Sequence, residues 1–167
     1  AQIKSTEVER WTWVINEYLR SNGLLNLSIE ITNTLRKQII KVLQKSVEEG
    51  WGIEETVRQL NTAKFPKWMA TRIVRTELAK ATNTGAYVGA MDAGIELEKM
   101  WISATDSRTR FIPRNKYDHL HMDGKIVGMD DGFVVPSLEN VESLLYPGDP
   151  KGSAGNLINC RCCVAFV

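Results

Sequence analysis

Apolar side chains recur at intervals of three and four along residues 6–93, the period of a helix with one buried face. Asparagine, glycine and proline, which commonly end or begin helices, divide this pattern into four stretches. The stretches predict helices over residues 6–22, 32–49, 53–61 and 66–93. Glycine and alanine dominate the second half of the last helix, so another backbone can approach it closely.

The apolar period changes near Gly94 from helical to strand-like. Short runs predict strands over residues 100–103, 125–127, 132–135 and 157–167. The intervening segments are long and rich in glycine or proline, and Asp123-Gly124 and Asp131-Gly132 have the composition of hairpin turns. The chain is therefore predicted to be α+β, with N-terminal helices packed on a small C-terminal antiparallel sheet that carries long ordered loops.

Charge and hydropathy exclude several classes of function. The 21 Lys and Arg residues nearly balance the 20 Asp and Glu residues, so the net charge of +1 does not require nucleic acid or an anionic membrane as partner. No apolar run of about 18 residues is long enough to span a membrane, and no signal peptide begins the chain. We therefore expect a soluble protein whose three cysteines stay reduced in a cytoplasm. Because the first residue is Ala1, we expect a processed product or a piece of a longer protein.

All three cysteines lie within four positions, at Cys160, Cys162 and Cys163. On a strand, alternate side chains face the same way, so Cys160 and Cys162 would share one face with their roots about 6.6–6.8 Å apart. Two thiols so placed can converge on a third group. Free cysteines are also among the most frequently buried residues, so plain core positions are the alternative.

Several short motifs follow one another in a fixed order through the second half of the chain. They are Arg75-Thr76-Glu77, Asn83, Gly85, Trp101, Asp106-Ser107-Arg108-Thr109-Arg110, His119, Asp123-Gly124 and Asn159-Cys160-Arg161-Cys162. This ordered set resembles the Mu F-like head morphogenesis family of phage minor head proteins. The resemblance covers residues 66–162, and residues 32–61 resemble the region before the motifs. It divides the chain into a helical N-terminal region, residues 1–65, and a Mu F-like module, residues 66–167.

The resemblance implies a minor capsid protein of the virion that acts at the portal vertex during head assembly in the bacterial cytoplasm. In some relatives the protein enters the host with DNA at ejection. The implied partners are the portal protein and capsid or scaffold proteins, with no membrane and no cofactor; indirect DNA contact and self-association stay open. The resemblance does not imply an enzyme. Some relatives carry toxin domains beyond this module, and we expect none here because the sequence ends soon after the last motif.

We expect the motif residues to form one structural cluster, consisting of Arg75, Glu77, Asp106, Arg108, His119, Asp123, Asn159, Cys160, Arg161 and Cys162. Asp106 can accept a fork of charge-assisted hydrogen bonds from Arg108 or Arg110. Arg161 can pair with one of three acids, Asp118, Asp123 or Asp149. In this interpretation the cluster is a polar lattice that orders long loops on a small sheet.

A zinc site is an alternative interpretation of the same residues. His119, Cys160 and Cys162 supply the nitrogen and sulfur ligands that Zn²⁺ prefers, with a fourth from His121, Asp106 or Asp123. Four protein ligands would make the metal structural, and only a variant with water in the fourth position would permit catalysis. The C-x-C spacing argues against zinc, because metal sites more often use C-x2-C.

The remaining alternative is a thiol-dependent enzyme or a toxin-associated effector on the same scaffold. Cys160 or Cys162 would be the nucleophile and His119 or His121 the base, although nothing local marks either thiol as activated. Among the five tryptophans, Trp13 lies off the apolar stripe of its helix, so it is the best candidate for an exposed contact with a partner.

Overall fold

The computed structural model describes residues 5–22, 33–60 and 66–167. Within these ranges the first four elements are helices: α1 (Ser5–Asn22), α2 (Asn33–Glu48), α3 (Ile53–Leu60) and α4 (Lys67–Asp92). The four predicted helices are confirmed to within one residue at each end, and two of the expected terminal residues, Thr32 and Asn61, lie outside the described ranges. Pro66 directly precedes α4, where its missing N–H removes no helical hydrogen bond.

Five short strands follow in the described part of the chain: β1 (Glu98–Ile102), β2 (Ile126–Gly128), β3 (Phe133–Val135), β4 (Glu142–Leu144) and β5 (Cys163–Phe166). β1 is the centre of an antiparallel sheet with the order β2-β1-β5, and β3 pairs with β4 in a separate antiparallel ribbon. A 3-10 turn, η1 (Leu120–Met122), and a short helix, α5 (Ala154–Leu157), lie in the long loops. The predicted α+β class is confirmed.

The C-terminal strand is shorter than the sequence predicts. The expected strand over residues 157–167 starts only at Cys163, because Cys163 pairs with the last residue of β1, Ile102, and no strand is left to pair with residues 160–162. Asn159 breaks the extended chain with a left-handed φ of 58°. β4 and α5 were not predicted.

The two turns predicted at Asp123-Gly124 and Asp131-Gly132 do not close hairpins. Asp123-Gly124 precedes β2 after a long loop, with Gly124 at a φ of 74°, and Asp131-Gly132 joins strands of different sheets. Neither therefore closes a two-residue hairpin between paired strands, because the partner of β2 is β1, far back in the chain.

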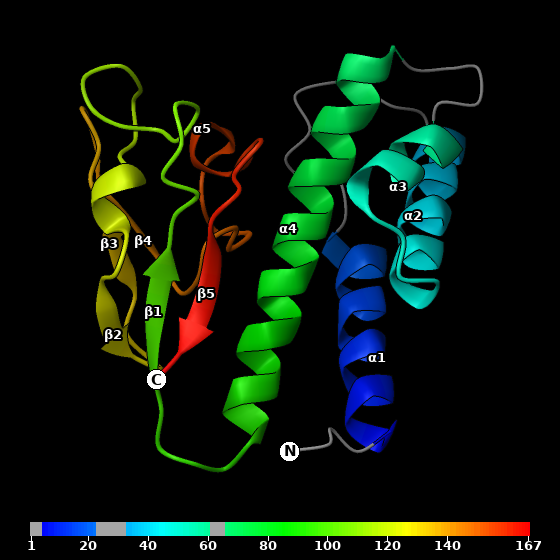
Figure 1. The fold of residues 1–167 in the computed structure, drawn as a ribbon, viewed down its shortest axis with the longest axis horizontal. Coiled ribbons are helices and arrows are strands. Elements are labelled where there is room, and N and C mark those ends of the chain that lie inside the picture. The colour runs from blue at the N-terminus through cyan, green and yellow to red at the C-terminus, as the bar shows by residue number, and fades with distance from the viewer. Residues whose placement is uncertain (1–4, 23–32, 61–65) are drawn as a thin grey trace.

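Helix α4 lies between the other three long helices and the sheet (Figure 1). On one side it buries a helical core with α1, α2 and α3, formed by Tyr18, Leu19, Ile39, Leu43, Val57, Leu60, Ala70, Ile73, Val74 and Ala81. In its second half α4 is approached closely at Gly85, where an added Cβ would lie 2.8 Å from Cγ1 of Ile15 on α1, so the neighbour there is a side chain and not the backbone that the sequence predicts. On its other side, α4 contacts β5.

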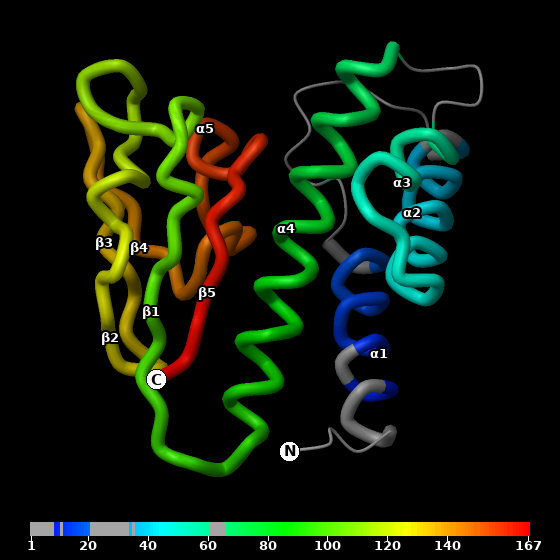
Figure 2. The backbone as a smooth tube through the Cα atoms, viewed as in Figure 1, coloured from blue at the N-terminus to red at the C-terminus, as the bar shows by residue number. Residues whose placement is uncertain are grey.

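A second core belongs to the sheet and its loops, and consists of Trp101, Tyr117, Met122, Phe133, Val135, Leu144, Cys160 and Cys162. Figure 2 shows that the chain leaving β1, the segment with α5 and the start of β5 gather at the same end of the sheet. The predicted site residues that follow β1 and precede β5 are therefore brought together there.

No helix in the described ranges is long and apolar enough to cross a membrane. The division of the chain at residues 65 and 66 stays a prediction, and α4, just after that boundary, packs against both parts.

Candidate functional site

The structure brings together His119, Cys160 and Cys162, which the sequence places 41 and 43 positions apart. The Nδ1 atom of His119 lies 3.6 Å from the Sγ atom of Cys160 and 3.5 Å from that of Cys162. The three donor atoms all lie within 4.8 Å of one another, and the three residues are buried. Cys163 is exposed. The two thiols thus converge on one imidazole, as alternation along the chain predicts.

A hydrogen-bond chain fixes the orientation of the His119 ring. Its Nε2 atom bonds Oδ1 of Asn156, and Nδ2 of Asn156 donates to Oε2 of Glu142 at 3.0 Å. Because a carboxylate only accepts hydrogen bonds, the amide nitrogen must face Glu142 and the amide oxygen must face His119. Nε2 therefore carries the proton in the neutral imidazole, and the lone pair of Nδ1 faces the two sulfur atoms.

Glu142 is held in turn by Tyr117 and Ser153. The Tyr117 hydroxyl donates to Oε1 of Glu142, and the backbone N–H of Ser153 donates to Oε2 at 3.0 Å. Burial would raise the pKa of the Glu142 carboxyl, but the hydrogen bonds from Tyr117, Ser153 and Asn156 outweigh it and hold the pKa at about 2. Glu142 therefore stays ionised and accepts hydrogen bonds throughout the physiological range.

We expect Glu142→Gln to lower the free energy of unfolding at pH 7 by about 1–3 kcal/mol, because it removes charge-assisted hydrogen bonds. The folded pKa is depressed, so this stabilisation is present above the ordinary value of 4.5 and is lost as the pH falls toward 2. Urea unfolding between pH 7 and pH 3 measures the difference between parent and variant. A difference that stays constant on acidification would contradict this assignment.

Two residues of α4 fix the backbone around the cysteines. Asn83 donates from Nδ2 to the carbonyls of Pro147, at 2.8 Å, and Cys162, at 3.1 Å, and its Oδ1 accepts the N–H of Val164 at 3.0 Å. Thr76 accepts the N–H of Asn159 through its hydroxyl at 2.9 Å. The segment that carries the thiols is therefore tied to the helix at both ends.

The predicted ion pairs form with different partners. Asp106 accepts the guanidinium fork, but the fork comes from Arg161. Arg110 donates instead to the carbonyl of Ile158, and Arg108 bonds Asp106 through its backbone N–H at 2.9 Å while its guanidinium stays 3.8 Å away. The fork from Arg161 holds the pKa of the Asp106 carboxyl well below its ordinary value. Arg161 thus bonds Asp106 from its position between the two thiols.

The acids predicted for Arg161 have other partners. Asp118 accepts the His121 ring at 2.8 Å, Asp123 accepts the N–H of Ser103 at 2.7 Å, and Asp149 accepts backbone N–H groups of its own loop. Glu77, also predicted to belong to the cluster, lies within α4 and pairs with Lys80.

The expected fourth metal ligand is also not in place. Among the described residues, no other histidine, cysteine or acid joins His119, Cys160 and Cys162 in one group of donor atoms.

The sequence does not indicate the roles of Asn156, Glu142 and Asn83. A single polar residue carries no local signal of a partner that is distant in the sequence.

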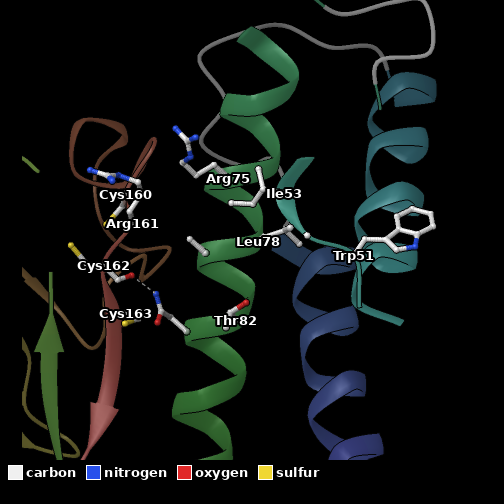
Figure 3. A pocket seen from close by; sticks show the side chains of 12 residues that line it. Trp51, Ile53, Arg75, Leu78, Thr82, Cys160, Arg161, Cys162 and Cys163 are labelled. Atoms are coloured by element: carbon white, nitrogen blue, oxygen red, sulfur yellow. Dashed lines mark hydrogen bonds between the residues drawn. The ribbon is translucent and has the colours of Figure 1, made fainter. Parts of the chain in front are cut away.

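A cleft of about 570 Å³ borders the cysteine segment. It is lined by Trp51, Gly52, Ile53, Arg75, Leu78, Ala79, Thr82, Asn83, Cys160, Arg161, Cys162 and Cys163. Figure 3 shows Arg75, Leu78 and Thr82 along α4, with the cysteine segment on one side of the helix and Trp51 on the other. The cleft therefore lies where the helical layer meets the C-terminal segment.

Electrostatics separate the two buried thiols. The contact with Cys160 is the main cause of a lowered pKa of the Cys162 thiol, and the nearby His119 ring adds to it, whereas the same contact with Cys162 and burial raise the pKa of the Cys160 thiol. The pair thus loses one proton readily and the second with difficulty. A lowered thiol pKa suits both a metal ligand and a nucleophile, so geometry must distinguish the two.

These features define an α+β domain in which a buried thiol–imidazole group and a central helix fasten the C-terminal segment to the sheet. A family model described as Phage Mu protein F like protein matches residues 37–165. The chain belongs to this family, which confirms the resemblance inferred from the motifs.

Three relatives show the range of proteins that share this segment. The chain is 31% identical over 116 residues to "Minor head protein GP7" of Bacillus phage SPP1, and 25% identical over 127 residues to "Uncharacterized protein YqbB" of Bacillus subtilis (strain 168). It is 29% identical over 118 residues to "NAD(+)--arginine ADP-ribosyltransferase EFV" of Enterococcus faecalis (strain ATCC 700802 / V583). The matches cover 65%, 75% and 68% of this chain but only 31%, 40% and 22% of the relatives. No solved structure matches the chain.

Proposed function

We propose that this chain is a module of a phage or prophage minor head protein and acts in head morphogenesis. The observation that carries the proposal is the family match over residues 37–165, joined by 31% identity to a protein named as a minor head protein. The chain would then be a component of the virion that contacts other capsid proteins during assembly in the bacterial host.

The finer proposal places the module at the portal vertex, with the portal protein as its principal partner, and extends to entry into the host with DNA at ejection. We propose that the module is not an enzyme. The relative named as an ADP-ribosyltransferase is consistent with this proposal. The shared segment covers only 22% of that protein, so most of its length remains for the named activity.

The best candidate contact for a capsid partner is Trp13 on α1, which is 64% exposed, as the sequence predicted. Exposed tryptophans are uncommon, and they are enriched among the residues that dominate binding energy at protein interfaces. Trp68 on α4 is similarly exposed, but its ring lies against the Arg72 guanidinium, 5.2 Å from the ring centroid. Trp68 therefore provides a matched comparison.

The proposal is tested by expressing an affinity-tagged full chain during phage head assembly and isolating portal-containing particles. We expect the chain to co-sediment with the particles. Trp13→Ala should reduce this association about tenfold or more, because truncating a central interface aromatic costs at least about 1–2 kcal/mol of binding. Deleting residues 1–30 is a poorer test, because Tyr18 and Leu19 belong to the helical core.

Trp68→Ala is the control and should leave the association unchanged, with both variants retaining the parental melting temperature. A chain that stays free of head particles while portal is present would refute the role in assembly. A Trp13→Ala variant that binds particles as well as the parent would place the contact on another surface.

A further inference from the structure

We propose that His119, Cys160 and Cys162 form a binding site for a divalent metal ion of the zinc class, with the fourth coordination position left to water or another small ligand. The site is separate from the proposed assembly role, because metal content and particle association are measured independently. Three observations carry the proposal: the positions of the donor atoms, the groups that hydrogen-bond to His119, and the lack of a fourth donor among residues 5–22, 33–60 and 66–167.

The donor atoms have the spacing that a tetrahedral zinc ion requires. Zinc bonds of about 2.3 Å to sulfur and about 2.0–2.1 Å to nitrogen place the two kinds of donor about 3.5–3.6 Å apart at the tetrahedral angle. The observed separations between Nδ1 of His119 and the two sulfur atoms are 3.6 Å and 3.5 Å. Both nitrogen–sulfur separations therefore match those around one tetrahedral ion, and the three donor atoms lie within 4.8 Å of one another.

The number of sulfur atoms favours a ligand set over a nucleophile and its base. The Nδ1 lone pair of His119 can accept one hydrogen at a time, and a catalytic pair needs only one thiol. Here two buried thiols face the same nitrogen, with exposed fractions of 3% for Cys160 and 5% for Cys162. A single cation satisfies both sulfur atoms and the nitrogen together, and it neutralises the charge that two thiolates would bring into the core.

The groups behind His119 match those that support metal-binding histidines. Such histidines usually donate their other ring N–H to a carboxylate or carbonyl, which fixes the ring and raises its basicity. Nε2 of His119 meets the amide oxygen of Asn156, and Asn156 is anchored by the ionised Glu142. The chain of contacts joins the loop before η1 to α5 and β4, so the ring is oriented before any ion binds.

The backbone of the cysteine segment is also fixed in advance. Asn83 holds the carbonyl of Cys162, and the fork between Arg161 and Asp106 draws the intervening side chain outward. Cys160 and Cys162 are therefore held on the inner side, and Cys163 is turned to the exposed side. This alternation explains how a C-x-C spacing can supply two ligands to one ion.

The fourth position has no donor from the described part of the protein. A cavity of about 10 Å³ borders His119 and Cys162 and is also lined by Arg108, Arg110 and Arg161. That volume is about what one water molecule needs. A site with two cysteines, one histidine and a water has the composition of an open zinc centre rather than a closed structural one.

The test uses the full chain, stripped with a strong chelator under reducing conditions and then titrated with Zn²⁺ and, separately, Co²⁺. We expect about one zinc per chain by elemental analysis after removal of free ion. Co²⁺ should give the visible bands of a tetrahedral ion together with near-ultraviolet charge transfer from sulfur. The optical signal reports thiolate coordination directly and does not depend on an activity.

Variants assign the ligands. Cys160→Ser and Cys162→Ser should each lower zinc affinity by about 100-fold or more and weaken the sulfur charge-transfer band. Asn156→Leu should lower affinity by about 10–100-fold, the usual effect of removing a group that orients a ligand. Cys163→Ser and His121→Gln are matched controls outside the donor group, and both should bind Zn²⁺ and Co²⁺ like the parent.

Parental protein that takes up no stoichiometric zinc and shows no sulfur-to-cobalt band would overturn the proposal, and this result does not depend on any variant folding. An equal loss of zinc binding in Cys163→Ser and Cys160→Ser would also overturn the proposal. Iodoacetamide supplies a third measure, since zinc-loaded protein should be alkylated at Cys163 alone. Rapid alkylation of Cys162 in that state would point instead to a free nucleophile.

Discussion

Replacing Asn83 by alanine should lower the free energy of unfolding by about 3–5 kcal/mol, because three buried backbone groups lose their partner at once. The carbonyls of Pro147 and Cys162 and the N–H of Val164 all bond this one amide. Each buried polar group left unsatisfied costs about 1–3 kcal/mol, with some relief if a water enters. Urea unfolding followed by circular dichroism measures the change.

Thr82→Ala is the matched control, since Thr82 is the exposed neighbour of Asn83 on α4 and should change stability by less than about 0.5 kcal/mol. Asn83→Asp should cost at least as much as the alanine variant, because its carboxylate would face two carbonyl oxygens. If the unfolding free energies of Asn83→Ala and Thr82→Ala differ by less than about 1 kcal/mol, the contacts of Asn83 with the C-terminal segment are dispensable.

Lys80→Met should also destabilise the protein by about 3–5 kcal/mol, because it removes the ammonium group of a buried ion pair and keeps the Glu77 carboxylate buried. The Nζ atom of Lys80 lies 3.1 Å from Oε1 of Glu77, and the two side chains are 2% and 0% exposed. Methionine preserves most of the aliphatic stem, which packs beneath Gly148, so the change acts chiefly on the charge. Thermal and urea unfolding both report the effect.

The exposed pair Arg58–Glu55 on α3 is the control, since it has the same three-residue separation as Lys80 and Glu77. Arg58→Met should change stability by less than about 0.5 kcal/mol, because solvent screens the pair and the freed carboxylate is hydrated. If Lys80→Met and Arg58→Met change the free energy of unfolding equally, other neighbours of Glu77 stabilise its negative charge.

Both predictions concern α4, the element that joins the two cores. Asn83 faces the cysteine segment, and Glu77 and Lys80 are buried within the helix one to two turns earlier. Asn83 links α4 to β5 and to the segment before it through hydrogen bonds, whereas the Glu77–Lys80 pair lies within the helix.

The sequence by itself determined the helices and the class of fold. A helix of two or more turns repeats its apolar period often enough to be recognised, so α1 to α4 were predicted to within one residue. The sequence also determined that Cys160 and Cys162 face one way and Cys163 the other, because neighbouring side chains alternate wherever the chain is extended. β4 was missed because Glu142-Ser143-Leu144 has only one apolar residue, whereas β2 and β3, equally short, are rich in the β-branched and aromatic residues that favour strands.

Tertiary structure alone decided the partners within the site. Asp106 and Arg161 are 55 positions apart, and which arginine reaches the carboxylate depends on how the two loops lie once the sheet has formed. The same holds for Asn156, which becomes the support of His119 only because α5 brings it beside the ring. Whether two loop residues form a hydrogen bond depends on differences of a few tenths of an ångström in their separation. No local pattern of residues encodes a distance between loops that are far apart in the sequence.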